Sequence, residues 1–348
     1  MGNFAHRNIC QQLCNIFSTA KKYLATALLP SLALLATLTL TSASVWADAV
    51  VATFPIGSGN TPLAVNPTTN IIYVTSPDIY GGLNSVKGFN PDGTSDGSSF
   101  AVGTDPLAIA VNPVTNKIYV ADDIGNFVTV IDVDYNTTTT VMVGTSPTAI
   151  AVNPVTNKIY VANKYSNDVT VIDGDTGLVT GTVGVGNAPI ALAVKSATAT
   201  SPTNMIYVAN SGSNDITVID GADNSILTTI PNVKAGGHRA IAANSVTNLI
   251  YVAGGLTNNI TVIDGGTNSI YATVATGGIN ATAIAINQVT NVIYVTNLGG
   301  NDAYGSYFPS DVTVIDGTSR RYDSCSYSGN IPVNFPGARR AAWNLAVR

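Results

Sequence analysis

A histidine and an arginine stand side by side at positions 238 and 239, and they are the residues of this sequence best suited to chemistry. The imidazole of His238 could act as a general base or as a metal ligand, and the guanidinium of Arg239 could hold an anionic substrate. In other copies of the repeat described below, Pro106, Pro147 and Pro189 occupy the place of His238. We therefore predict that the pair lies near the mouth of a central channel, either as a binding site or as a solvent-facing turn without chemistry.

Two loops carry aromatic side chains that could contact a partner. The segment from Leu298 to Asp311 is nine residues longer than its counterparts and contains Tyr304, Tyr307 and Phe308. A four-residue insertion in the first unit carries Tyr80. Exposed aromatic side chains can anchor a sugar ring, a peptide or a protein. We predict that both loops contribute to a binding surface. The alternative is that the longer loop folds over the channel or onto a neighbouring unit and buries its own aromatics.

Four further residues complete the predicted binding set, because they fall in equivalent loops of other units: Asp122, Asp123, Lys164 and Tyr165. Other aspartates stand in turns that resemble calcium loops only faintly, at 132–136 and 173–177, and neither turn has the full EF-hand pattern. Asp-Gly pairs recur at equivalent turns, so turn formation explains them. No nucleophile-elbow, Walker or HExxH motif occurs. We assign no catalytic residue, no metal ligand and no cofactor.

These residues belong to a repeat that fills the middle of the 348-residue chain. One copy spans Asn153 to Asp173, NPVTNKIYVANKYSNDVTVID, and close copies occur from Asn66 almost to the C-terminus. The tyrosine of each I-Y-V motif lies at Tyr73, Tyr119, Tyr160, Tyr207, Tyr251 and Tyr294. By subtraction these tyrosines are 41 to 47 residues apart, a period typical of a propeller blade with four strands. All 20 acidic residues are aspartate, which favours turns over helices.

Each unit is predicted to contain four strands, which in the third copy span 148–152, 158–162, 168–172 and 178–183. The third strand, V-T-V-I, alternates as a half-exposed strand would. We expect the fourth-to-first connections and the second-to-third loops to share one end, the upper face. The N-P-x-T-N and D-G turns would then lie on the lower face. Upper loops vary between units whereas lower turns repeat, so the upper face is the predicted binding face.

The repeats resemble the YVTN family of β-propeller repeats. The tetrapeptide itself stands at Tyr294 to Asn297, and the variants YVAN and YVTS begin at Tyr160, Tyr207 and Tyr73. The resemblance covers roughly residues 49 to 316 and rests on several repeated offsets. It implies a propeller of a kind often found on cell surfaces or in the periplasm, including surface-layer-like proteins. It implies no shared reaction and no shared catalytic residues.

We predict an all-β fold, a β-propeller of four-stranded blades. The sequence contains six sets of first, second and third strands; the last set lacks a convincing fourth strand, and one spare fourth strand, AVVATFPI, stands at 49–56. If this N-terminal strand completes the last blade, the ring closes and no strand edge is exposed. Six blades is therefore the economical count. Seven is the alternative, because relatives are often seven-bladed and residues 317–348 could form a degenerate unit.

The two ends of the chain differ from the repeats. Residues 1–47 hold basic residues, an apolar run and a small-x-small pattern, so we predict a signal peptide cleaved after Ala47, with an uncleaved anchor as the alternative. The propeller would span 48–316. Residues 317–348 lose the period and gain five arginines, forming a divergent basic tail that reflects either a reading-frame change or sequence divergence. The repeats contain no cysteine, which excludes disulfides, thiolate metal sites and c-type haem there.

Charge argues against a nucleic-acid partner. Residues 48–316 hold 19 aspartates and seven basic residues, a formal difference of −12, whereas nucleic-acid binding needs a basic face. We predict an exported, non-enzymatic binding module in the periplasm, on the cell surface or secreted, with a protein or carbohydrate partner and no membrane span after cleavage. One alternative is an enzyme of the lyase or lactonase kind, with Asp122, Asp123, His238 and Arg239 around a divalent metal. The other is a structural surface-layer-like component.

Overall fold

The structure is a computed structural model that describes residues 62–76, 84–198, 203–233, 238–254, 258–276, 280–301, 307–308, 310–317 and 325–326. The chain divides into two units, residues 1–50 and 51–348, and all described residues belong to the second. The predicted signal peptide, the predicted strand at 49–56, Tyr80 and Tyr304 lie outside the described residues. In the described part of the chain, no helix is long and apolar enough to cross a membrane.

The described residues form six antiparallel sheets of four strands and one small hairpin. The first sheet contains β1 (Leu63–Val65), β2 (Ile72–Ser76), β3 (Ser85–Phe89) and β4 (Ser95–Ala101). The second contains β5 (Pro106–Asn112), β6 (Lys117–Asp122), β7 (Phe127–Asp132) and β8 (Thr137–Met142). The third contains β9 (Pro147–Asn153), β10 (Lys158–Asn163), β11 (Asp168–Asp173) and β12 (Val179–Gly184).

The other three sheets repeat this order. The fourth contains β13 (Pro189–Lys195), β14 (Met205–Asn210), β15 (Asp215–Asp220) and β16 (Ile226–Ile230). The fifth contains β17 (His238–Asn244), β18 (Leu249–Gly254), β19 (Asn259–Asp264) and β20 (Ser269–Ala275). The sixth contains β21 (Ala281–Asn287), β22 (Val292–Asn297), β25 (Asp311–Asp316) and β26 (Cys325–Ser326).

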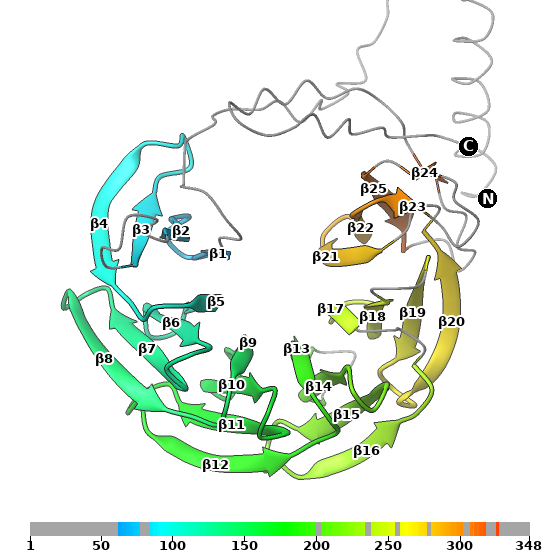
Figure 1. Cartoon of the computed structure of the whole chain (residues 1–348), viewed down its shortest axis with the longest axis horizontal. Coiled ribbons are helices and arrows are strands. Elements are labelled where there is room, and N and C mark those ends of the chain that lie inside the picture. The colour runs from blue at the N-terminus through cyan, green and yellow to red at the C-terminus, as the bar shows by residue number, and fades with distance from the viewer. Residues whose placement is uncertain are drawn as a thin grey trace, which may run out of the picture. The chain divides into compact units, whose positions relative to one another are not determined.

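Consecutive sheets contact each other through their first strands. β1 contacts β5, and the same contact follows between β5 and β9, β9 and β13, β13 and β17, and β17 and β21. In Figure 1 these first strands lie on the inside, and the fourth strands β4, β8, β12, β16 and β20 lie on the outside. The all-β prediction is confirmed, and the arrangement of four-stranded sheets is propeller-like. The predicted strands of the third unit agree with β9 to β12 within one residue.

Two features of the sixth unit differ from the expectation. We predicted no fourth strand after Asp316, but the short strand β26 pairs with β25 through Thr313 with Ser326 and Val314 with Cys325. The inserted loop also contains structure of its own, because β23 (Gly300–Asn301) pairs with β24 (Tyr307–Phe308). Backbone pairing of this kind depends on tertiary geometry that the repeat pattern does not encode.

The core lies between the sheets. On β10, the run from Ile159 to Ala162 is fully buried on both faces, because neighbouring sheets cover the middle strands from each side. The third strands β7, β11, β15 and β19 are also buried, so the prediction that this run is half-exposed was wrong for these four sheets. In β25 the V-T-V-I run alternates between half-buried and buried residues, as predicted. Thr170 on β11 is only 2% exposed, and its hydroxyl accepts a hydrogen bond from Asn163 Nδ2 at 2.8 Å. A satisfied threonine can replace an apolar residue in such a strand.

Hydrogen bonds confirm which loops share an end of the sheets. At the upper end, the N–H of Lys164, in the loop after β10, donates to the carbonyl of Ser146, which precedes β9, at 2.8 Å. At the lower end, the N–H of Gly174, after β11, donates to the carbonyl of Asn157, after β9, at 2.8 Å. Asn157 has a φ of 51°, a left-handed conformation that asparagine tolerates better than most residues. This requirement explains the second asparagine of the N-P-x-T-N motif.

The asparagine that ends the second strand has a structural role. Asn163 is fully buried and donates from Nδ2 to Asp168 Oδ1 at 2.7 Å and to Thr170 Oγ1. We expect Asn163→Ala to lower the free energy of unfolding by roughly 1–3 kcal/mol, because it leaves buried acceptors without a donor. Urea denaturation measures this loss. The exposed Thr138 supplies the control: Thr138→Ala should change stability by less than about 0.5 kcal/mol. Equal effects of the two substitutions would contradict the assigned role.

Candidate functional site

Four of the predicted binding residues meet at the upper end, where the second and third sheets adjoin. Ser146 links the two loops that carry them: its hydroxyl donates to Asp123 Oδ1, and its carbonyl accepts the N–H of Lys164. The N–H of Ser146 donates to Asn126 Oδ1 at 2.8 Å. The N–H of Tyr165 donates to the carbonyl of the residue before Ser146 at 3.1 Å. These bonds fix the two loops against each other.

Asp122 lies beneath this surface and not on it. It ends β6, its side chain is fully buried, and both carboxylate oxygens accept backbone hydrogen bonds. Oδ2 accepts the N–H of Asp105 at 2.9 Å, and Oδ1 accepts the N–H of Gly125 at 2.5 Å. The register places Asp122 where the third sheet has Asn163. Asp122 is therefore a loop-fixing residue, in contrast to the exposed binding residue that we predicted.

Two exposed side chains and one half-buried side chain lie on the fixed loops, and we call them the upper patch: Ile124, Tyr165 and the half-buried Lys164. The side chains of Ile124 and Tyr165 are 71% and 68% exposed. Lys164 Nζ lies 4.9 Å from the centroid of the Tyr165 ring, within the range of a cation–π interaction. The patch thus offers an aromatic ring, an aliphatic side chain and an ammonium group on a backbone that is already ordered.

The carboxylates below the patch influence one another. Burial, followed by the negative charges of Asp123 and Asp122, raises the pKa of the Asp105 carboxyl. Burial removes water that would stabilise the ionised carboxylate, and the two neighbouring carboxylates disfavour a third negative charge. In the described residues, no group of three or more His, Cys, Asp or Glu side chains could hold a metal ion.

The other predicted residues are not brought into this patch. His238 begins β17 just as Pro106, Pro147 and Pro189 begin β5, β9 and β13, so its predicted place in the repeat is confirmed. Two whole sheets separate β17 from β6, so His238 does not belong to the same cluster as Asp122. The backbones of Arg239, Tyr307 and Phe308 are described as parts of β17 and β24, but their side chains, like that of His238, lie outside the described residues.

The aspartate turns use their oxygens internally. Asp173 Oδ1 accepts the N–H groups of Asp175 and Thr176, at 3.1 and 2.8 Å, and the hydroxyl of Thr176 at 2.8 Å. These hydrogen bonds to the ionised form lower the pKa of the Asp173 carboxyl. Asp175 Oδ1 accepts the side-chain amide of Asn157 at 2.7 Å. The turn geometry alone accounts for the pattern that resembled a calcium loop.

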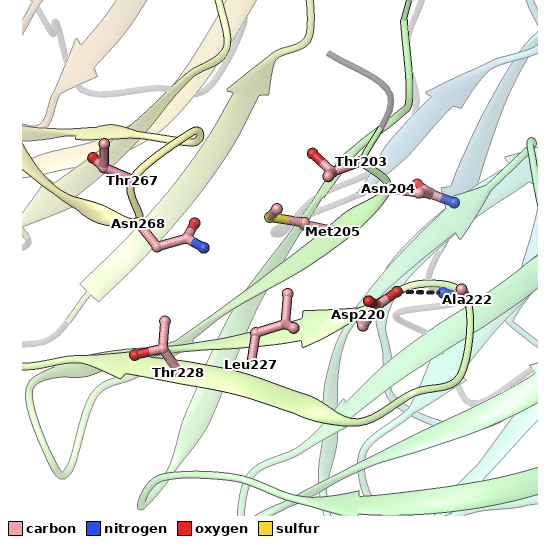
Figure 2. A pocket seen from close by; sticks show the side chains of 9 residues that line it. All are labelled: Thr203, Asn204, Met205, Asp220, Ala222, Leu227, Thr228, Thr267 and Asn268. Atoms are coloured by element: carbon pink, nitrogen blue, oxygen red, sulfur yellow. Dashed lines mark hydrogen bonds between the residues drawn. The ribbon is translucent and has the colours of Figure 1, made fainter.

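A cavity of about 610 Å³ opens at the lower end of the fourth sheet, on the face where we expected only repeated turns. Figure 2 shows its lining, which comes from the start of β14, the β15–β16 turn, β16 and the β19–β20 turn: Thr203, Asn204, Met205, Asp220, Ala222, Leu227, Thr228, Thr267 and Asn268. Met205, Leu227 and Asn268 point into the space, whereas Asn204 points away from Met205. The signal that could have found it is Met205, which stands where the two preceding units have lysine.

Comparison with known proteins concerns the fold. No protein-family model and no curated protein matches the chain. Among solved structures, the chain is similar to one described as Kuenenia stuttgartiensis hydrazine synthase, with a TM-score of 0.56 and 22% identity, covering 69% of this chain and 71% of that chain. Similarity at this level of identity reflects shared architecture and does not transfer an activity. It agrees with the propeller-like arrangement of the six sheets.

Proposed function

We propose that this chain is an exported, non-enzymatic binding protein that holds a protein or carbohydrate partner of the cell envelope on its upper patch. The observation that carries the proposal is the exposed Tyr165 ring on a backbone fixed by hydrogen bonds, with the Lys164 ammonium above it. Such a ring combines an apolar face with a polar hydroxyl and loses little conformational freedom when a partner binds.

The sequence supports the remaining parts of the proposal. The apolar leader in residues 1–47 and the resemblance to YVTN repeats favour export to the periplasm, the cell surface or the medium. We propose a six-bladed ring, because a closed ring removes exposed strand edges. The edge of β25 that residues 49–56 were predicted to cover is paired with the short strand β26 at Thr313 and Val314, so we propose no closing role for residues 49–56. The acidic balance of the repeats favours a partner other than nucleic acid.

The enzyme alternative has less support. A lyase or lactonase site needs polar groups that converge on a substrate, and the two oxygens of Asp122 are already used by backbone N–H groups. Two sheets also separate Asp122 from His238. The surface-layer alternative predicts that the purified chain assembles into ordered arrays, which electron microscopy of the purified protein would reveal.

Capture experiments test the binding proposal. The purified chain is immobilised and presented with a cell-envelope extract and with a glycan array. We expect Tyr165→Ala to reduce binding by roughly tenfold or more, because exposed aromatic anchors commonly dominate binding energy. Tyr135, which is 79% exposed in the β7–β8 turn at the lower end, supplies the matched control. Tyr135→Ala should bind like the unmodified chain; equal losses in both variants would contradict the assignment.

A further inference from the structure

At the lower end, the residue that begins the second strand reaches the turn of the next sheet. Lys117 begins β6, and its ammonium donates to the carbonyls of Gly174 at 3.4 Å and Asp175 at 2.9 Å, in the β11–β12 turn. Lys158 begins β10 and does the same one sheet later: it donates to Gly221 at 3.4 Å and Ala222 at 3.0 Å. The repeat thus places a lysine ammonium on two turn carbonyls at two successive boundaries.

At the boundary between the first and second sheets, apolar side chains occupy the positions of the lysine and the turn glycine. Ile71 stands two residues before Tyr73, as Lys117 stands two before Tyr119, and the facing turn carries Val133 where the later turns carry glycine. Ile71 and Val133 both pack against the same hydrophobic core cluster. Where a lysine stands two residues before the tyrosine, the facing turn has a glycine. Where an isoleucine stands there, the facing turn has a valine.

The boundary between the fourth and fifth sheets has neither combination. Met205 begins β14 and pairs with Asp220, just as Lys158 pairs with Asp173. The facing β19–β20 turn contains Gly265 and Gly266, so it presents no apolar side chain to Met205 as Val133 does at the first boundary. A thioether cannot donate a hydrogen bond to a turn carbonyl. The cavity lies at this mismatch, with Met205 on one side and the β19–β20 turn on the other (Figure 2).

The lining of the cavity suits a cation with an aliphatic chain. Asp220 is the one ionisable side chain among its nine lining residues, and its Oδ1 accepts the N–H of Ala222 at 2.8 Å. Asn268 Oδ1 accepts the hydroxyl of Tyr207 at 2.7 Å. At the preceding boundary the equivalent oxygen, that of Asn224, accepts both the tyrosine hydroxyl and the lysine ammonium. Met205 and Leu227 supply an apolar wall beside these acceptors (Figure 2).

A buried lysine nearby has a different role. Lys195 is fully buried, and its ammonium donates to Thr203 Oγ1 and to Asn248 Oδ1, both at 2.8 Å. Lys195 is the last residue of β13. Asn112 holds the equivalent position at the end of β5, and its Nδ2 donates to Oδ1 of Asn157, the equivalent of Asn248, in the next sheet at 2.6 Å. The carboxylate of Asp264 partly offsets the charge of Lys195. The Lys195 side chain therefore makes the hydrogen bond between sheets that an asparagine makes at the earlier boundary. It does not stand in for the lysine that is absent from the start of β14.

We propose that this cavity binds a primary alkylammonium group, whose charged head takes the place that the lysine ammonium occupies at the two preceding boundaries. The Asn268 amide oxygen and the Asp220 carboxylate accept its hydrogen bonds and balance its charge, and the alkyl chain lies against Met205 and Leu227. This site is at the opposite end of the sheets from the upper patch and is independent of it.

The test uses n-butylammonium, which reproduces the lysine side chain beyond the α-carbon, and titrates it into the full chain while NMR or calorimetry records binding. We expect it to bind roughly tenfold more tightly than the neutral isostere n-butanol, because hydrogen bonds between an ammonium and protein acceptors are charge-assisted. Met205→Lys should weaken n-butylammonium binding by about tenfold or more, since the new side chain supplies its own ammonium. Asp220→Asn, which keeps a side-chain oxygen and removes the charge, should also weaken it.

The control adds the same charge at the equivalent position of the next sheet. Leu249 begins β18 and does not line the cavity, so Leu249→Lys should leave n-butylammonium binding unchanged. Thermal melts establish that each variant is folded, and Asp220→Asn decides the matter if Met205→Lys does not fold. Equal affinity for n-butanol, or binding that neither Met205→Lys nor Asp220→Asn weakens, would overturn the proposal.

Discussion

Replacing Tyr160 by alanine is expected to lower the free energy of unfolding by roughly 3–5 kcal/mol. The side chain of Tyr160 is fully buried between sheets, and its hydroxyl donates to Asn224 Oδ1 of the next sheet at 3.0 Å. The substitution removes a large apolar surface from the core, leaves a cavity that neighbouring strands fill only partly, and breaks a link between two sheets. Urea denaturation followed by far-ultraviolet circular dichroism measures the loss.

Two matched variants separate the causes of this loss. Tyr160→Phe keeps the ring and removes only the hydrogen bond, so we expect it to cost about 1 kcal/mol. Tyr294 holds the equivalent position in the sixth sheet but is 39% exposed, so Tyr294→Ala should cost distinctly less than Tyr160→Ala. If Tyr294→Ala were as destabilising as Tyr160→Ala, burial between sheets would not be the source of the effect.

Alkaline pH is expected to destabilise the fold through the same tyrosines. Burial raises the pKa of Tyr119 and of Tyr160 to about 12, and it also raises the pKa of Tyr207. Below pH 10, the tyrosines are protonated in both the folded and the unfolded chain. Between pH 10 and about 12, the unfolded chain loses these protons while the folded chain retains them, so rising pH favours unfolding. Each of Tyr119 and Tyr160 should contribute a loss of roughly 2–3 kcal/mol over that range.

A single substitution tests the alkaline prediction. Phenylalanine does not ionise, so in Tyr160→Phe the loss of stability between pH 10 and 12 should be smaller by roughly 2–3 kcal/mol than in the unmodified chain. Lys195 acts in the opposite direction at lower pH. Burial lowers its pKa, so its contribution makes stability rise with pH only until the unfolded chain has lost the lysine proton, at roughly pH 10.5. An identical alkaline loss in both proteins would show that Tyr160 does not carry it.

The strands and their order could be predicted because the same sequence pattern recurs in several units. The second strand expected at 158–162 is β10, and His238 begins β17 as the proline positions suggested. The separation of upper and lower loops followed from the alternation of antiparallel strands. In contrast, the burial of Thr170 depends on its partner Asn163 and on the sheets that cover it. That information is absent from the hydrophobic pattern of one strand.

Only some residues of the candidate sites could be predicted from the sequence. Lys164 and Tyr165 were expected in the upper loops, and Ser146 joins the backbone of Lys164 to Asp123, a contact between units that no single unit reveals. The cavity was missed for a related reason. Met205 is visible as a departure from lysine, but its meaning requires the knowledge that this side chain reaches the turn of the next sheet.

Hydrogen–deuterium exchange of the chain with and without its captured partner locates the bound surface and so shows whether the partner binds at the upper patch. Exchange is expected to slow at the upper end between the second and third sheets, in residues 122–126, 144–146 and 163–167. The turns of the same sheets at the lower end, residues 133–136 and 174–177, should exchange as before. Slower exchange confined to those lower turns, with the upper loops unchanged, would contradict the proposed binding face.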